Sequence, residues 1–155
     1  MDLYDELVAV VDALAEAKLD YAVCGGLAVA FHGYTRFTRD IDLMIRTEDV
    51  SQALEAIESI GFRFSEGNIP FAVATEFEGT IHRVSKFAAK DHLTLDFLLV
   101  NPSIQDVWDG RETFEWTSGK RIQVVSRMGL QKLKRIAGRR QDLLDLEELG
   151  LNDNK

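Results

Sequence analysis

Apolar residues recur along the chain with two different periods, and the period separates helical from extended segments. Spacings of three and four residues, with capping residues and glycine stops, predict helices over residues 2–18, 27–31, 47–60, 101–108, 126–138 and 142–149. Alternating or continuous apolar runs predict strands over residues 21–24, 40–45, 62–64, 71–77, 80–87, 92–100, 113–116 and 120–125, with turns at 66–70, 78–79 and 90–91. The pattern therefore predicts an α/β fold: a mixed β-sheet with helices packed against it and a short helical C-terminal part.

The length of 155 residues suits one domain, residues 1–155, with a core of its own. The net charge of −8 argues against broad electrostatic binding of nucleic acid, although eight of the eighteen basic residues lie within residues 120–140 and leave room for a local anion site. No apolar run approaches the length of a membrane span, the first residues are acidic, and Cys24 is the single cysteine. We therefore expect a cytoplasmic protein without a disulfide and without a membrane partner.

Three carboxylates interrupt strands that are otherwise apolar. Asp40 and Asp42 lie two residues apart, so they share one face of their strand, and Asp96 lies inside the later strand 92–100. Burying such charges is costly unless a cation or a shared proton compensates. If the two strands are neighbours, the three acids converge on a site that suits Mg²⁺ or Mn²⁺. The three histidines are too scattered to favour zinc: His32, His82 and His92.

Taken together, these motifs resemble the nucleotidyltransferase superfamily of DNA polymerase β. The shared elements are the Gly25-Gly26 turn, a spacer, the Asp40-Ile41-Asp42 strand and a third acid, Asp96. The chain is especially similar to small bacterial and archaeal members akin to the abortive-infection type nucleotidyltransferase toxins, through residues 25–33, 36–42 and 134–145. The resemblance spans residues 21–149 and implies the nucleotidyltransferase fold.

The resemblance also implies an enzyme that uses two metal ions to move a nucleoside monophosphate from a nucleoside triphosphate, ATP for example, to an acceptor hydroxyl. Asp40 and Asp42 would hold both Mg²⁺ or Mn²⁺ ions, and Asp96 would bind the ion on the side of the nucleophile. The acceptor stays open between an RNA end, a protein side chain and a small molecule such as an aminoglycoside or lincosamide antibiotic.

Phosphate binding is the second implication of the resemblance. The backbone of Gly25 and Gly26 would approach the phosphates of the nucleotide. Many superfamily members have serine where this chain has Gly26, so a hydroxyl would have to come from Thr35 or Thr38.

Positive charge for the phosphates would come from Lys134 and Arg139 in the C-terminal helices. Arg36 and Arg39 either bind nucleotide phosphates or balance the charge of the acid pair.

Other interpretations of the same residues stay open. Asp96 is alternatively a structural acid paired with a buried arginine, while Asp142 and Asp145 are expected to pair with a nearby arginine or to cap a helix. The whole chain is alternatively a catalytically weak nucleotide-binding protein, and either version fits one half of a toxin–antitoxin or phage-defence pair. Because the domain is small, we expect a homodimer or a partner protein such as an antitoxin to complete the site.

Overall fold

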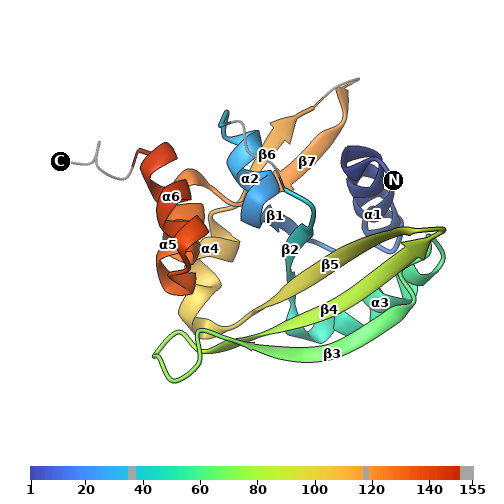
Figure 1. Ribbon diagram of the computed structural model, residues 1–155, viewed down its shortest axis with the longest axis horizontal. Coiled ribbons are helices and arrows are strands. Elements are labelled where there is room, and N and C mark those ends of the chain that lie inside the picture. Colours follow the sequence, from blue (N-terminus) through green and yellow to red (C-terminus); the bar gives the residue numbers. More distant parts are fainter. Residues whose placement is uncertain (35–37, 117–118, 151–155) are drawn as a thin grey trace.

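The computed structural model describes residues 1–34, 38–116 and 119–150, which form a mixed β-sheet with helices around it (Figure 1). The strands are β1 (Ala22–Cys24), β2 (Ile41–Arg46), β3 (Phe64–Phe71), β4 (Gly79–Ala88), β5 (Asp91–Val100), β6 (Glu112–Glu115) and β7 (Arg121–Val124). The α-helices are α1 (Leu3–Glu16), α2 (Gly25–Phe31), α3 (Val50–Glu58), α4 (Gln105–Asp109), α5 (Arg127–Ala137) and α6 (Arg140–Glu148). Two short 3₁₀ helices, η1 (Thr47–Asp49) and η2 (Pro102–Ile104), precede α3 and α4. The predicted fold class is confirmed.

The sheet has the strand order β3-β4-β5-β2-β1-β7-β6. Strand β2 runs parallel to β5, and β1 runs parallel to β7, while the other neighbouring pairs are antiparallel. Helices α4, α5 and α6 gather at one end of the molecule, and α1 and α3 lie at the other (Figure 1). None of the helices in the described ranges combines the length and the apolar character that a membrane span requires.

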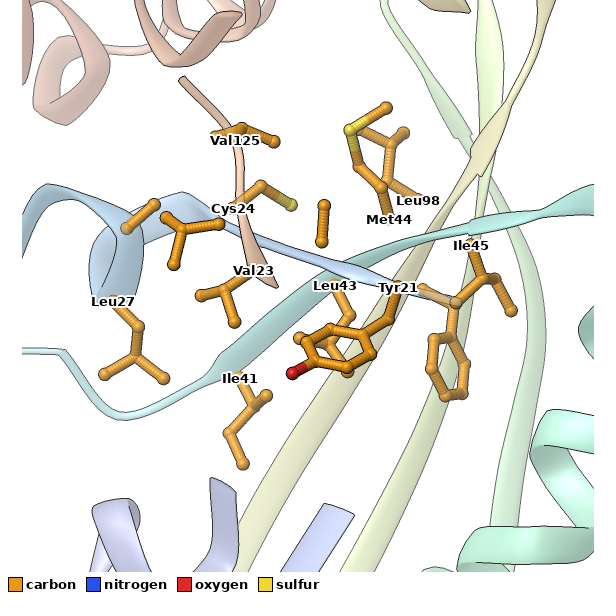
Figure 2. Close-up of a cluster of buried hydrophobic side chains, with 14 of the residues drawn as sticks. Tyr21, Val23, Cys24, Leu27, Ile41, Leu43, Met44, Ile45, Leu98 and Val125 are labelled. Carbon is orange, nitrogen blue, oxygen red and sulfur yellow. The ribbon is translucent and has the colours of Figure 1, made fainter. Parts of the chain in front are cut away.

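The core has two halves, one on each side of the central strands. Figure 2 shows Val23 and Leu43 on one side of β1 and β2, while Cys24 and Met44 point to the other. This alternation follows from the two-residue period of a strand, and all four side chains are buried. The side of Cys24 and Met44 is also the side of Asp42, because residues 42 and 44 are two apart.

The first helix behaves as its apolar spacing predicts. Its buried side chains are Leu7, Val10, Val11 and Leu14. Asp2 is the N-cap, and its carboxylate accepts a hydrogen bond from the backbone N–H of Asp5.

Helix α5 begins and ends at the predicted signals, whereas α6 begins at Arg140 and not at the predicted Asp142, because Arg139 is its N-cap and Asp142 lies at the third helical position. The Ser126 hydroxyl accepts a hydrogen bond from the Gly129 N–H at the start of α5. Gly138, with a φ of +62°, ends α5 in the left-handed conformation, and α6 begins two residues later.

The prediction for residues 62–77 is wrong. A turn was expected at residues 66–70 between two strands, whereas β3 runs unbroken from Phe64 to Phe71 and the turn follows it. The misleading turn residues are Gly67, where φ is +77° at a bulge in the pairing with β4, and Pro70. Both are tolerated because β3 lies at the edge of the sheet, where a strand needs partners on one side only.

Candidate active site

Two of the three predicted acids lie side by side on neighbouring parallel strands. Asp42 in β2 is directly opposite Asp96 in β5 in the pairing register. Asp42 is half-buried, and Asp96 is 8% exposed. Asp40 precedes the first residue of β2 and is exposed. The condition for convergence, that the two acid-bearing strands are neighbours, is met for Asp42 and Asp96.

The juxtaposed carboxylates disfavour one another's negative charge. Burial, then the charges of Asp96 and Asp40, raise the pKa of Asp42 to about 7, although Lys134 and Arg139 oppose the shift. The negative charge of Asp40, which lies just before β2, therefore contributes to the raised pKa of Asp42. A cation placed between these carboxylates would relieve the repulsion.

Arg83 of β4 holds Asp96 from the other side. Its Nε donates to Oδ1 at 2.8 Å and its Nη2 donates to Oδ2 at 3.0 Å, which is the bidentate geometry of a strong arginine–carboxylate pair. The hydrogen bonds to Asp96 raise the pKa of Arg83 above its ordinary value. The open alternative for Asp96, a pairing with an arginine, is thus observed, although Arg83 is 38% exposed. Each carboxylate oxygen has a second lone pair, so Asp96 can still bind a cation.

Gly25 fits closely against Asp42. It has a φ of +64°, and a Cβ atom at this position would lie 2.2 Å from Oδ2 of Asp42. Any side chain here would collide with the carboxylate. Glycine is therefore needed at this position for two reasons: it tolerates the positive φ, and it has no Cβ atom. Gly26 is buried within α2.

These groups open into one pocket of about 330 Å³. Its polar lining consists of Asp42, Asp96, Asp142, Arg83, Lys134 and Arg139, with Cys24 and Gly25 beside them. Its apolar lining consists of Ile69, Pro70, Phe71, Ala72, Ile81, Leu98, Leu130, Leu133 and Ala137. The volume is sufficient for a small ligand or for part of a larger one.

The two predicted basic residues reach the pocket, but acids hold both. The Nζ of Lys134, a residue 5% exposed, is 3.2 Å from Oδ1 of Asp142 and 2.9 Å from Oδ2 of Asp145. The Nε of Arg139 lies 2.7 Å from Oδ2 of Asp142. Asp142 also accepts a hydrogen bond from the Arg139 N–H at the start of α6. The expected pairing of Asp142 with a neighbouring arginine is therefore confirmed, as is its capping role, whereas Asp145 pairs with a lysine.

Other predicted residues are not brought into this pocket. Thr38 is half-buried outside its lining, and Thr35 and Arg36 fall outside the described residues. In the described ranges, no group of three or more Asp, Glu, His or Cys side chains is close enough to hold a metal ion. The donor set nevertheless fits a divalent cation, because Asp42 and Asp96 offer adjacent carboxylates. Gly25, which has no side chain, leaves space for the carboxylate of Asp42.

Arg83 and the apolar lining are the parts of the site that the sequence pattern did not reveal. Arg83 occupies an ordinary alternating position in a predicted strand, and only the register with β5 places it opposite Asp96. Ile69 was assigned to a turn. A signal for Arg83 existed in principle, because a buried acid calls for a cation and Arg83 lies in the strand that precedes β5.

Comparisons with known proteins agree with this geometry. A sequence model of the aminoglycoside-2''-adenylyltransferase family matches residues 6–149. Comparison with curated proteins gives no match.

Solved structures share the fold. A Thermotoga maritima protein considered a nucleotidyltransferase aligns with a TM-score of 0.61 and 17% identity, over 97% of this chain and 92% of its own. The lincosamide antibiotic adenylyltransferase LnuA, bound to lincomycin, aligns with a TM-score of 0.59 and 16% identity, over 94% of each chain. The ANT(2'')-Ia enzyme in complex with adenylyl-2''-tobramycin aligns with a TM-score of 0.58 and 16% identity, over 96% of this chain and 90% of its own.

The predicted membership of the nucleotidyltransferase superfamily is confirmed by these matches. Because the family match covers nearly the whole chain, the protein belongs to the aminoglycoside-2''-adenylyltransferase family and is a nucleotidyltransferase.

Proposed function

We propose that the protein transfers an adenylyl group from ATP to the hydroxyl of a small molecule, with a divalent cation held by Asp42 and Asp96. The observation that carries this proposal is the direct pairing of these two acids, one of them packed against Gly25. ATP is favoured as the donor, and a small molecule as the acceptor, because the matched family is named for an enzyme that adenylylates an aminoglycoside.

The proposed cation is Mg²⁺ or Mn²⁺. When bound, it would stabilise charge on the transferring phosphate and lower the pKa of the acceptor hydroxyl. Asp40 would complete the cation site, because it immediately precedes β2, two residues from Asp42, and its exposed side chain can rotate toward Asp42. Asp96, on the β4 side of Asp42, would orient the acceptor hydroxyl and accept its proton.

The nucleotide phosphates would lie between the Gly25 turn and the C-terminal helices. Lys134 and Arg139 both line the pocket, and Arg139 is 77% exposed at its side chain. Each would exchange part of its interaction with Asp142 for an interaction with phosphate. Arg36 and Thr38, from the segment before β2, are proposed as additional contacts to the nucleotide.

A transfer assay tests this function. Purified protein is incubated with Mg²⁺, α-labelled ATP and a small-molecule extract, and label transfer is measured. Asp42→Asn and Asp96→Asn are expected to reduce transfer by about 10²–10³-fold, because each removes charge at the cation site. Asp109→Asn, an equivalent change in an exposed acid of α4, serves as the control.

Two outcomes would contradict the proposal. Transfer that persists in Asp42→Asn would exclude the assigned site. Tight ATP binding by the wild type without transfer to any acceptor would instead support the nucleotide-binding alternative. The expected homodimer or antitoxin partner is a separate proposal, which gel filtration and co-purification test.

A further inference from the structure

The pocket has a polar end and an apolar end, and the strand register determines both. Asp42, Asp96 and Arg83 are paired across β2, β5 and β4. Two residues further along the same strands, the paired residues are Met44, Leu98 and Ile81, followed by Ile69 on β3. Because residues two apart share a face, this apolar row lies on the same face of the sheet as the acids.

Helix α5 packs over the apolar row. The space between Ile69, Ile81 and Leu98 of the sheet and Leu130 and Leu133 of α5 is called the slot below. Leu130 and Leu133 line the pocket together with Ile81 and Leu98. Phe71, at the end of β3, also lines the pocket and is half-buried. A ligand that extends from the acids over β4 and β3 therefore meets aliphatic and aromatic side chains on both sides.

The next step rests on the proposed function. In an in-line displacement, the attacking hydroxyl and the departing pyrophosphate lie on opposite sides of the phosphorus atom. If the phosphates lie toward Gly25, on the β1 side of Asp42, the acceptor approaches from the Asp96 side. The acceptor then extends over β4 and β3, which is the apolar end of the pocket.

The charges at this end disfavour a polycation. Arg83 is itself positive and occupies both oxygens of Asp96. Asp142 is already held by Lys134 and Arg139. Asp42 and Asp96 lie at the polar end, where the proposed divalent cation would neutralise them, so ammonium groups over the apolar row would lose water without a carboxylate beside them.

We propose that the acceptor is a hydroxyl compound with an apolar body and little positive charge, and that Ile69 and Ile81 contact this body. The opposite direction along the strands offers the contrasting surface. There Thr94 and Ser85 are paired, and the Ser85 hydroxyl donates to Glu66 at 2.9 Å. Ser85 itself is buried, so a cationic acceptor would be expected at the exposed carboxylate of Glu66, which we call the polar surface.

Three probes separate these possibilities. Glucose and octyl glucoside share the sugar hydroxyls but differ in an apolar tail, and tobramycin is a polycation. Binding is measured by titration calorimetry with Mg²⁺ and a non-hydrolysable ATP analogue present. Octyl glucoside is expected to bind at least about tenfold more tightly than glucose, and tobramycin no more tightly than glucose.

Substitutions assign the difference to the slot. Ile81→Asp and the milder Ile69→Ser are expected to weaken octyl glucoside binding by about tenfold or more and to change affinity for the ATP analogue by less than about twofold. Phe87→Ser, a change at a residue 55% exposed on β4, is the control and is expected to change neither affinity. Thermal unfolding verifies that each variant is folded.

The proposal is overturned if tobramycin binds more tightly than octyl glucoside, or if both isoleucine variants bind octyl glucoside as the wild type does. Equal affinity for glucose and octyl glucoside also overturns it. Weaker tobramycin binding in Glu66→Gln would place the acceptor on the polar surface. In each of these cases binding of the ATP analogue persists, whereas its absence in the wild type would refute the proposed function itself.

Discussion

Gly25 and Asp42 are in such close contact that a Cβ atom on residue 25 would lie 2.2 Å from Oδ2 of the carboxylate. Gly25→Ala should therefore displace Asp42 and lower the transfer rate by about 10²-fold or more, since a shift of about 1 Å at a reacting centre has this effect. The positive φ adds a loss of about 1–3 kcal/mol in the free energy of unfolding. Steady-state kinetics and urea titration measure the two effects.

Gly119→Ala is the matched control for this change. Gly119 has a φ of +73°, and apart from its chain neighbours no atom of the part of the chain that the structure describes lies within 4 Å of the position that its Cβ would take. The Gly119→Ala variant should lose a similar amount of free energy of unfolding and keep its transfer activity. Full activity in Gly25→Ala would show that the position of Asp42 does not matter for transfer.

Arg83→Met should make the stability of the protein depend on divalent cations. The substitution leaves Asp96 without its bidentate partner and should lower the free energy of unfolding by about 1–3 kcal/mol in the absence of metal. A cation bound at Asp96 replaces the lost positive charge, so Mg²⁺ should raise the melting temperature of Arg83→Met more than that of the wild type. Differential scanning fluorimetry with and without Mg²⁺ measures this.

Arg63→Met is the control for the Mg²⁺ response, because the Arg63 side chain donates to the backbone carbonyl of Glu58 and to no carboxylate that the structure describes. Equal Mg²⁺ responses in the two arginine variants would refute a cation site at Asp96.

Asp142 should stabilise the fold at neutral pH and lose this effect in acid. Burial acts to raise its pKa, but the hydrogen bond from Arg139 and the charges of Lys134 and Arg139 outweigh it, so the pKa lies below its ordinary value. A depressed pKa stabilises the folded state above the unfolded-state pKa of about 3.9, and the effect disappears as the pH falls through the folded-state pKa. Asp142→Asn should cost about 1–3 kcal/mol at pH 7.

Urea unfolding of the wild type and Asp142→Asn at several pH values measures this difference. The two curves should begin to approach one another below about pH 4 and should meet only below the folded-state pKa of Asp142, where this side chain is neutral in both states. A difference that stays constant down to pH 3 would mean that packing, and not charge, accounts for the effect of Asp142.

Removal of divalent cations with a chelator should abolish transfer, and Mg²⁺ or Mn²⁺ should restore it. Zn²⁺ should not, because the proposed ligands are carboxylate oxygens. Cys24 lines the same pocket, but burial and then the charge of Asp42 raise the pKa of its thiol well above its usual range. Zinc binding would require this thiol to lose its proton against that shift, so the carboxylates remain the proposed ligands. Restoration of transfer by Zn²⁺ alone would contradict the proposed ligand set.

The sequence was informative where burial made a residue costly. A carboxylate inside an apolar strand needs compensation, and this argument singled out Asp42 and Asp96, whose strands the structure places side by side. Helix boundaries at Ser126 and Gly138 were predictable for a related reason, because helix ends need specific capping groups.

The parts that could not be predicted depend on register and context. Nothing local distinguishes Arg83 from other arginines, and its role follows from a pairing thirteen residues away in the sequence. Gly67 and Pro70 are ordinary turn residues that a bulged edge strand also accepts, so local signals led to the wrong prediction. Likewise, Ile69 contributes to the apolar end of the pocket because it belongs to that strand and not to a turn.

The same irregular strand β3 also protects the sheet from unwanted growth. An edge strand presents unpaired backbone groups on which a further strand, from a second molecule, could add. In β3 the bulge between Ser65 and Gly67 disturbs the hydrogen-bonding ladder, and Pro70 has no N–H to donate. A row of β3 edges is therefore a poor template for fibrils, and replacing Pro70 with a β-branched residue would remove one barrier to aggregation at this edge.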